Sequence, residues 1–206
     1  MTVDVYIECD PRDLGFQTGQ AAAKHIKDKL GGKAKVALLA FKSLSPEQSD
    51  ARSGGFRDAL KDLPGVEIVA EQDAWLPEMA VKKAGDMLTA HPDLNIVWSA
   101  NEGGTVGSVL AVKNSGKAGK VAVFGTDVSE QMLSFLKSDD GILQAITAQK
   151  PFAIGQTAVR AALQVLGGKK VEKRIILKGD CLKRDDPDGV AAYEKQLKDW
   201  IASGQK

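Results

Sequence analysis

Short apolar segments alternate with amphipathic segments along almost the whole chain. The apolar segments are rich in Val, Ile, Leu and Ala, and their lengths suit strands that are buried on both faces of a parallel sheet. We expect strands at about Val3–Glu8, Lys35–Ala40, Val66–Ala70, Asn95–Ser99, Val121–Gly125, Leu143–Thr147 and Arg174–Leu177.

Helices are expected between these strands, because apolar residues recur there at spacings of three and four. The first helix places Gly15, Gly19 and Ala22 on one face, and Gly31-Gly32 ends it. The other helices are expected at about Gln48–Leu63, Pro77–Ala90, Glu102–Ser115, Ser129–Ser138 and Pro151–Leu166. This alternation predicts an α/β fold with a doubly wound parallel sheet and right-handed crossovers.

The end of the chain departs from this alternation. A charged connector, Lys183–Asp188, follows the last expected strand. After it, Val190, Tyr193, Leu197 and Ile201 recur at helical spacing on one face. We expect a C-terminal helix that docks on the body of the protein.

The composition excludes several classes of protein. Lys and Arg number 28 against 27 Asp and Glu, so no basic surface is predicted for nucleic acid. No apolar run approaches the length of a membrane span, and the residues after Met1 are typical of a strand rather than a signal peptide. Cys9 and Cys181 form neither a disulfide framework nor a metal motif, and we interpret them as unpaired packing residues.

The sequence offers little for an enzyme. His25 and His91 are far apart, which argues against a histidine metal cluster or a histidine base. The glycine-rich stretch Gly103–Gly107 lacks the Gly-x-Gly-x-x-Gly spacing, and neither a Gly-Lys-Ser/Thr nor a Gly-x-Ser-x-Gly motif occurs. We therefore expect no catalytic residues, no metal and no cofactor.

Polar and aromatic residues follow several of the expected strands. Arg52 comes after one strand, Trp75 after the next, and Asn101 and Asp127 after two more. The carboxyl ends of parallel strands lie along one rim of a sheet, so these residues are expected to meet there. A guanidinium, an indole, an amide and a carboxylate together suit a neutral polyhydroxylated ligand. The pattern predicts a sugar-type binding site.

Simpler interpretations exist for the same residues. Arg52 could be a solvated residue at a helix start, and Asn101 and Asp127 could both be helix caps. Trp75 is expected in a loop, where one ring face stays open for stacking on a sugar. By contrast, Trp98 lies within an apolar run and is expected in the core, and Trp200 is expected to pack the C-terminal helix.

Several short motifs follow one another in a fixed order over about Val3–Val171. They are Cys9-Asp10, Ala51-Arg52-Ser53-Gly54-Gly55-Phe56, Ala90-His91-Pro92-Asp93-Leu94, Ser99-Ala100-Asn101-Glu102, Val123-Phe124-Gly125-Thr126-Asp127 and Ala148-Gln149-Lys150-Pro151-Phe152-Ala153-Ile154-Gly155. Together they resemble the type I periplasmic sugar-binding proteins, above all the ribose-binding group. These proteins are substrate-binding components of ABC transporters and share a Rossmann-like architecture with the effector domains of lactose-repressor-type regulators.

The resemblance implies a function and a set of site residues. The ligand-binding residues that it implies are Arg52, Trp75, Asn101, Asp127, Gln149 and Asp10. They would bind a monosaccharide or a related polyol by hydrogen bonds and stacking, with closure of a hinge at Gln149, in a periplasmic protein that delivers the sugar to an ABC permease. Thr126 stands where the family often has an aromatic residue, so the kind of sugar stays open. The alternative is the effector or sensor domain of a lactose-repressor-type regulator or a membrane receptor.

The same resemblance divides the chain into segments. Residues 1–10 would be a crossover strand, 11–149 the ligand-binding C-terminal lobe, 150–178 a segment that returns to the first lobe, and 179–206 the charged connector with the C-terminal helix. The N-terminal half of the first lobe is expected to be absent from this chain. The helix face over 154–165 would then be uncovered, and we expect it to fold back on its own lobe or to associate with a second copy.

Overall fold

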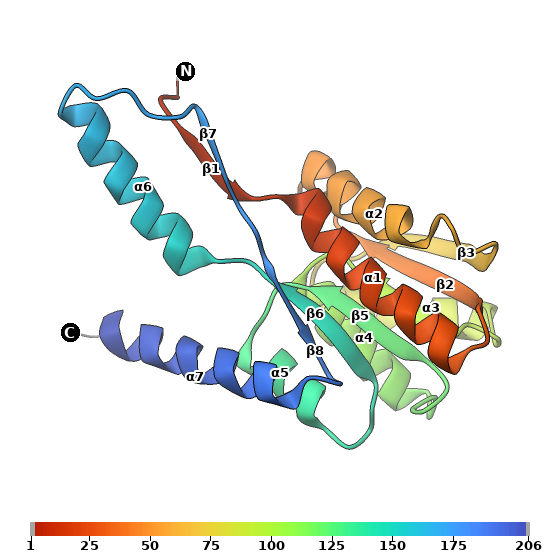
Figure 1. The fold of residues 1–206 in the computed structure, drawn as a ribbon. Coiled ribbons are helices and arrows are strands. Elements are labelled where there is room, and N and C mark those ends of the chain that lie inside the picture. Colours follow the sequence, from red (N-terminus) through yellow and green to blue (C-terminus); the bar gives the residue numbers. More distant parts are fainter. Residues whose placement is uncertain (1–2, 205–206) are drawn as a thin grey trace.

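The computed structural model describes residues 3–204, which form two sheets and the helices around them (Figure 1). The strands are β1 (Tyr6–Cys9), β2 (Lys33–Ala40), β3 (Gly65–Asp73), β4 (Ile96–Ser99), β5 (Ala122–Thr126), β6 (Leu143–Ala148), β7 (Arg174–Leu177) and β8 (Asp180–Lys183). The helices are α1 (Pro11–Lys29), α2 (Pro46–Leu60), α3 (Pro77–Ala90), α4 (Glu102–Asn114), α5 (Glu130–Lys137), α6 (Pro151–Leu166) and α7 (Pro187–Gly204). The predicted doubly wound α/β fold is confirmed.

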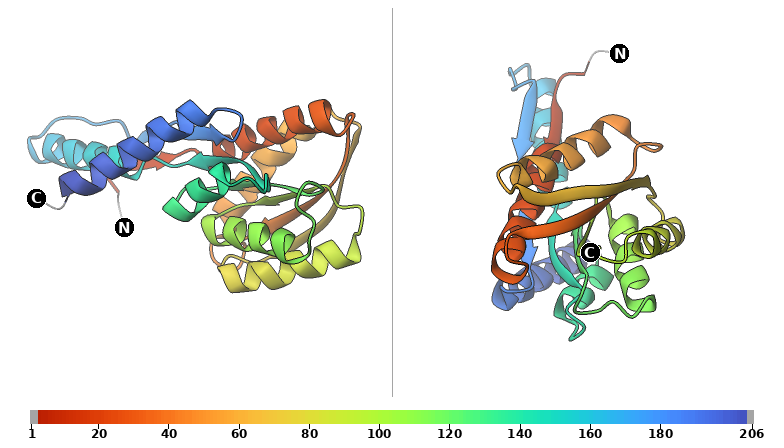
Figure 2. Two further views of the ribbon diagram at one scale, coloured as in Figure 1. Left: turned by 90° about the horizontal axis from the view of Figure 1, so that it is seen from below. Right: turned by 90° about the vertical axis from the view of Figure 1, so that its right-hand side faces the viewer.

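The larger sheet has six strands in the order β3-β2-β4-β5-β6-β8. Neighbouring strands from β3 to β6 are parallel, and β8 runs antiparallel to β6 at one edge. Helices α1 and α2 cover one face of this sheet and α3 and α4 cover the other (Figure 2). Helices on both faces make the central strands inaccessible to water, as expected for a parallel sheet.

Successive side chains of each strand point to opposite faces of the sheet, so the strands contribute to two apolar cores, one on each face. In β2, Val36 and Leu38 face the core under α1 and α2, whereas Ala37 and Leu39 face the core under α3 and α4. This alternation follows from the two-residue period of a strand. Trp98 is buried in the first core, as the sequence predicted, and its indole N–H donates to Thr18 Oγ1 at 3.0 Å.

The smaller sheet contains only β1 and β7, which pair in parallel. With α6 packed against β1, the pair extends away from the six-stranded sheet (Figure 1). We expected both strands to be buried, but they are half exposed, with Tyr6 and Ile176 among the exposed residues. The reason is that only one helix covers them. Three connections join this unit to the larger sheet, one before α1, one before α6 and one between β7 and β8.

Helix α6 does not fold back on the six-stranded sheet, so that part of the expectation is wrong. Within the expected 154–165 face, Ala161 is buried and Ile154 and Val165 are half-buried. The helix contacts β1 of the two-stranded unit, whereas Ala158 and Ala162 of the same face are exposed. The large apolar residues that α6 leaves exposed are Phe152, Val159, Leu163 and Leu166. Association with a second copy stays a prediction.

The segment after β7 contains a strand that the sequence did not predict. Of the four residues of β8, Asp180–Lys183, only Leu182 is fully buried, so the apolar signal is too weak to mark a strand. The expected C-terminal helix is α7. On its predicted apolar face Val190 and Tyr193 are buried and Leu197 is half-buried, but Ile201 is exposed, so only the first part of this face docks on the body. Trp200 packs as expected, with its ring stacked on Phe152 of α6 at 5.4 Å between centroids.

Both cysteines are unpaired, as the sequence indicated. Cys9 is buried at the end of β1, and Cys181 is half-buried on β8. Burial raises the pKa of the Cys181 thiol to about 11. The thiol therefore stays protonated at neutral pH.

Candidate functional site

Arg52 and Asp127 meet at the carboxyl ends of the parallel strands. Arg52 lies in α2, the helix after β2, and Asp127 directly follows β5. The Nη1 atom of Arg52 lies 3.3 Å from Oδ2 of Asp127. The Arg52 side chain is 6% exposed and the Asp127 side chain 23%, so the carboxylate is the more accessible partner. The two crossovers thus bring opposite charges together at one rim, where parallel α/β sheets bind ligands.

The backbone conformation of Asp127 directs its carboxylate into this site. Its φ angle is 76°, in the left-handed region that Asp and Asn tolerate better than most residues. Its backbone N–H donates to the Thr147 carbonyl at 2.7 Å, which fixes the turn after β5. The carboxylate accepts the Gln149 side-chain amide at 2.6 Å and the Glu102 backbone N–H at 3.1 Å. Asp127 is therefore held by β6 and by the first turn of α4, where the helix dipole favours a negative charge.

The Arg52 guanidinium is held in place from two sides. Its Nη1 donates to the Ala100 carbonyl at 2.7 Å, and the guanidinium lies 5.3 Å from the centroid of the Phe41 ring. The Nε atom is buried without a hydrogen-bond partner among the described residues. A donor in this state is costly unless water or a ligand approaches it. Arg52 is thus buried and held in place, so the interpretation as a solvated residue is wrong.

Asn101 caps a helix, which was one of the two interpretations left open. Its Oδ1 accepts the Gly104 N–H at 3.1 Å as the N-cap of α4. Its Nδ2 donates to the Trp75 carbonyl at 2.9 Å. Trp75 lies in the loop after β3, as expected, and its half-buried ring packs against the core under α1 and α2. Asn101 thereby fixes the loop that carries the indole at the same rim.

Gln149 and Asp10 occupy two of the three connections between the sheets. Gln149 follows β6 and belongs to the Arg52–Asp127 group through its amide. Asp10 follows β1, and its carboxylate accepts the Arg12 N–H at 2.9 Å as the N-cap of α1. No hydrogen bond between described residues joins Asp10 to Arg52 or Asp127. Its expected ligand contact stays a prediction.

A cavity of about 210 Å³ lies beside this group, between α2 and the two-stranded unit. Its lining residues are Tyr6, Ile7, Glu8, Cys9, Pro11, Gln48, Arg52, Gln149 and Ile154. The sequence interpretation did not select Gln48, which lies in α2, or Phe41 beneath Arg52. Phe41 directly follows β2, so the rule that selects strand ends would have found it.

The described residues include no group of three or more His, Cys, Asp or Glu that could hold a metal ion. None of the helices within residues 3–204 has the length and apolar character to cross a membrane. Burial raises the pKa of the Cys9 thiol beside the cavity, which disfavours the nucleophilic thiolate. The described residues at this rim offer hydrogen-bond donors and acceptors, a pair of opposite charges and an indole.

A family model described as the periplasmic binding protein domain matches residues 2–170. This match extends over most of the chain and includes Arg52, Trp75, Asn101, Asp127 and Gln149. The chain belongs to the periplasmic binding protein family.

Three relatives illustrate the similarity. The ABC transporter periplasmic-binding protein YphF of Escherichia coli K12 is 29% identical over 175 residues, which is 84% of this chain and 53% of YphF. The ribose import binding protein RbsB of Bacillus subtilis 168 is 34% identical over 158 residues, 76% of this chain and 50% of RbsB. The D-allose-binding periplasmic protein of E. coli K12 is 32% identical over 155 residues, 74% of this chain and 49% of that protein. The chain spans about half the length of the curated relatives it matches.

Solved structures agree with the fold. A periplasmic solute-binding protein from Actinobacillus succinogenes 130z, solved with bound D-allose, superposes with a TM-score of 0.82 at 26% identity over 90% of this chain and 64% of that one. GanP, a glucose-galactose binding protein from Geobacillus stearothermophilus, gives a TM-score of 0.81 at 27% identity over 89% of this chain and 63% of GanP.

Proposed function

We propose that this chain is the solute-binding component, or the larger part of one, of a sugar ABC importer. The single observation that carries the proposal is the group formed by Arg52, Asp127 and Gln149 at the carboxyl rim of the sheet. A buried cation, a partly exposed carboxylate and an amide offer both donors and acceptors in fixed positions. Sugar hydroxyls need this combination, because each hydroxyl both donates and accepts.

The proposed mechanism is binding and not catalysis. Asp127 accepts hydroxyl protons in charge-assisted hydrogen bonds, and Arg52 donates to neighbouring hydroxyl oxygens. Trp75 stacks on the apolar face of the ring, and Asn101 keeps the Trp75 loop in position. Asp10 lies at the start of α1 and approaches the ligand from the β1 connection.

The two sheets suggest how the protein responds to its ligand. We propose that residues 11–149 are the ligand-binding lobe and that residues 1–10 and 150–178 belong to a second lobe. The remaining segment, 179–206, adds the edge strand and the C-terminal helix. The three connections act as a hinge. Gln149 lies in one of them and donates a hydrogen bond to Asp127, so a ligand that binds to Asp127 affects this connection directly.

The proposed setting follows from the relatives. They are described as import or periplasmic binding proteins for ribose and D-allose, which supports a periplasmic location, a membrane permease as partner and a monosaccharide or related polyol as ligand. These descriptions favour transport over the regulator or receptor alternative. Thr126 leaves the individual sugar open.

Titration of the ¹⁵N-labelled chain with a panel of pentoses and hexoses tests the proposal. We expect weak binding, because the group formed by Arg52, Asp127 and Gln149 approaches the ligand from one side. The amide signals of Asp127, Gln149 and Glu102 should shift with at least one sugar. Arg52→Met should abolish these shifts, whereas Arg57→Met, on the same helix, should retain them. Shifts confined to other regions, or none with any sugar, would refute the site, and sub-micromolar affinity would refute the expectation of weak binding.

A further inference from the structure

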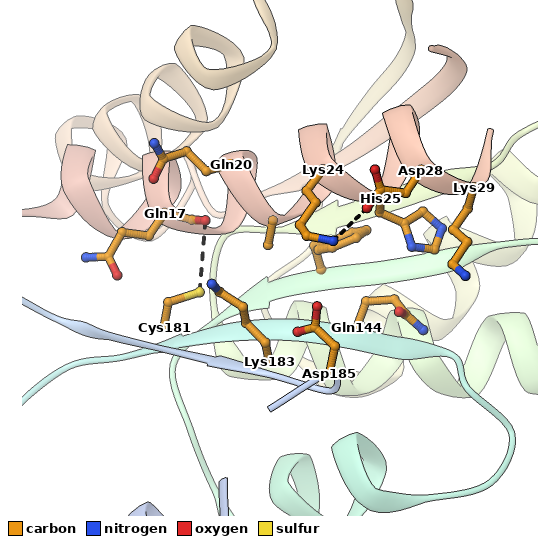
Figure 3. A pocket seen from close by; sticks show the side chains of 12 residues that line it. Gln17, Gln20, Lys24, His25, Asp28, Lys29, Gln144, Cys181, Lys183 and Asp185 are labelled. Carbon is orange, nitrogen blue, oxygen red and sulfur yellow. Dashed lines mark hydrogen bonds and ion pairs between the residues drawn. The ribbon is translucent and has the colours of Figure 1, made fainter. Parts of the chain in front are cut away.

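A second cavity, larger than the first, lies on the other side of α1. Its volume is about 310 Å³, and it separates α1 from the edge strand β8 (Figure 3). Gln144 on its floor lies near the start of β6, whereas Gln149 of the sugar site follows the end of β6. The cavity therefore lies toward the opposite end of the sheet and shares no lining residue with the site at Arg52.

One wall of this cavity is a polar stripe of α1. Gln17, Gln20, Lys24 and Asp28 recur at spacings of three and four and therefore share a face of the helix. Lys24 Nζ pairs with Asp28 Oδ2 at 2.6 Å, so the charge of this lysine is already matched within the wall.

The opposite wall comes from β8. Cys181 and Lys183 lie two residues apart and share the strand face toward α1, whereas Leu182 points to the other core. The Cys181 thiol reaches the Gln17 carbonyl at 3.9 Å, which locates this face against the helix. Figure 3 shows Lys183 extending from β8 toward α1.

Lys183 has no ion pair among the described residues, in contrast to Lys24. The cavity is lined by three lysines, Lys24, Lys29 and Lys183, and by two aspartates, Asp28 and Asp185. With one positive charge in excess, the cavity favours an anion. An ammonium without a partner gains more from a bound carboxylate than one that is already paired.

The back of the cavity is apolar and aromatic. Phe124 and Ala21 line it, and the His25 ring meets Phe124 edge to face with centroids 5.8 Å apart. Burial, followed by the charge of Lys29, lowers the pKa of His25, so the imidazole is neutral at neutral pH. Neither ring nitrogen has a hydrogen-bond partner among the described residues. A neutral imidazole then offers one donor and one acceptor to a ligand.

We propose that this cavity is a second binding site, which takes a small planar organic anion of the aromatic carboxylate class. Lys183 binds the carboxylate, and the ring of the ligand lies against Phe124 and Ala21. His25 and the side-chain carbonyl oxygen of Gln144 are available for a polar substituent on that ring, since the Gln144 amide nitrogen already donates to the Gly141 carbonyl. The ligand needs both a ring and a negative charge. An uncharged ring or a small anion without a ring should therefore bind more weakly than an aromatic carboxylate.

Benzoate is the probe, followed by amide shifts of the ¹⁵N-labelled chain. Benzyl alcohol supplies a ring without the charge, and acetate supplies the charge without the ring. We expect benzoate to shift the amides of residues 17–29 and 181–185 and to bind more tightly than either control compound. Lys183→Met should weaken benzoate binding about tenfold, the usual effect of one charge-assisted hydrogen bond.

Two further variants separate the site from general effects. Lys27→Met removes an exposed lysine of α1 that does not line the cavity, and it should leave benzoate binding unchanged. Ala21→Leu should block binding by filling the cavity. Equal binding of benzoate and acetate, or unchanged binding in Lys183→Met, would overturn the proposal. The sugar titration follows different amides, so the failure of either site is seen separately.

Discussion

The Arg52 guanidinium and the Asp127 carboxylate lie 75 positions apart in the chain and 3.3 Å apart in space. Neither element alone would hold its charged group out of water, because an isolated buried ion is strongly unfavourable. The pair is therefore part of the stability of the lobe as well as its proposed binding group. Substitutions here are expected to affect both properties.

Arg52→Met should lower the free energy of unfolding by about 2–3 kcal/mol, because it leaves the Ala100 carbonyl and the Asp127 carboxylate without their partner. Urea denaturation measures this change. Arg57→Met is the matched control, since Arg57 pairs with Glu71 at 2.7 Å but both side chains are at least 31% exposed. That loss should stay below about 1 kcal/mol. Equal losses would contradict the structural role of Arg52.

Asp127→Asn and Asp127→Val separate the charge of this residue from its backbone conformation. Asparagine tolerates the φ of 76°, so Asp127→Asn should keep the backbone conformation. It should lose the ionic interaction with Arg52 and one of the two hydrogen bonds that Gln149 and Glu102 donate to separate carboxylate oxygens, about 2–3 kcal/mol in total. Valine is branched at Cβ and disfavours the left-handed region, so Asp127→Val should lose about 1–2 kcal/mol more. Thermal unfolding ranks the two variants. If they are equally stable, the φ angle of Asp127 is not a constraint.

Gly15→Ala should destabilise the protein and displace Arg52. A Cβ atom at Gly15 would lie 1.8 Å from the Arg52 carbonyl oxygen, so α1 and α2 would have to separate. Overpacking of this kind costs about 1–3 kcal/mol. Gly85→Ala in α3 is the control, because no atom lies within 4 Å of the place that a Cβ would occupy there, and alanine favours a helix over glycine by about 0.5–1 kcal/mol. Chemical denaturation should show a lower free energy of unfolding for Gly15→Ala and a higher one for Gly85→Ala.

The stability of the protein should fall as the pH rises from 9 to 11. Burial raises the pKa of Cys181 from 9.0 to about 11, so the folded chain keeps this proton in a range where the unfolded chain loses it. Denaturation midpoints at several pH values measure the slope. Cys181→Ala should reduce the slope without removing it, since burial also raises the pKa values of Cys9 and Tyr193. An unchanged slope in this variant would contradict the burial of the thiol.

The exposed apolar residues of α6 should make the chain self-associate. Val159, Leu163 and Leu166 are 62%, 65% and 84% exposed, and covering such a surface contributes about 25 cal/mol per Å². Sedimentation should show a concentration-dependent dimer that Leu163→Glu converts to a monomer. The exposed polar residue Gln164 provides the control variant Gln164→Glu, which should still dimerise. A wild-type chain that stays monomeric at high concentration would exclude this association.

Local signals in the sequence account for most of the fold. The bounds of α3 were predicted to the residue, because Pro77 suits the first turn of a helix and His91-Pro92 stops one. The β8 strand was missed, because its existence depends on the open edge of β6 and not on its own four residues. A strand of this kind is defined by its neighbour.

The candidate site also contains one feature that the sequence predicted and one that it did not. The placement of Arg52 and Asp127 at one rim follows from the order of strands and helices alone. The bond from Asn101 to the Trp75 carbonyl joins two loops, and nothing near either residue indicates it. The sequence therefore left the role of Asn101 open between a helix cap and a ligand contact.

The pairing of β1 with β7 has a consequence for the order in which the protein folds during synthesis. Glu8 and Arg174 form an ion pair across 166 positions, so β1 leaves the ribosome long before its partner strand exists. Strands β2 to β6 lie between β1 and β7 in the chain and can pair first, and β8 adds to their edge once it is synthesised. The larger sheet then holds α1 close to the start of β8, where the Gln17 amide donates to the Gly179 carbonyl at 3.3 Å. The long loop is then already closed, and the last strand pair can form at little further entropic cost.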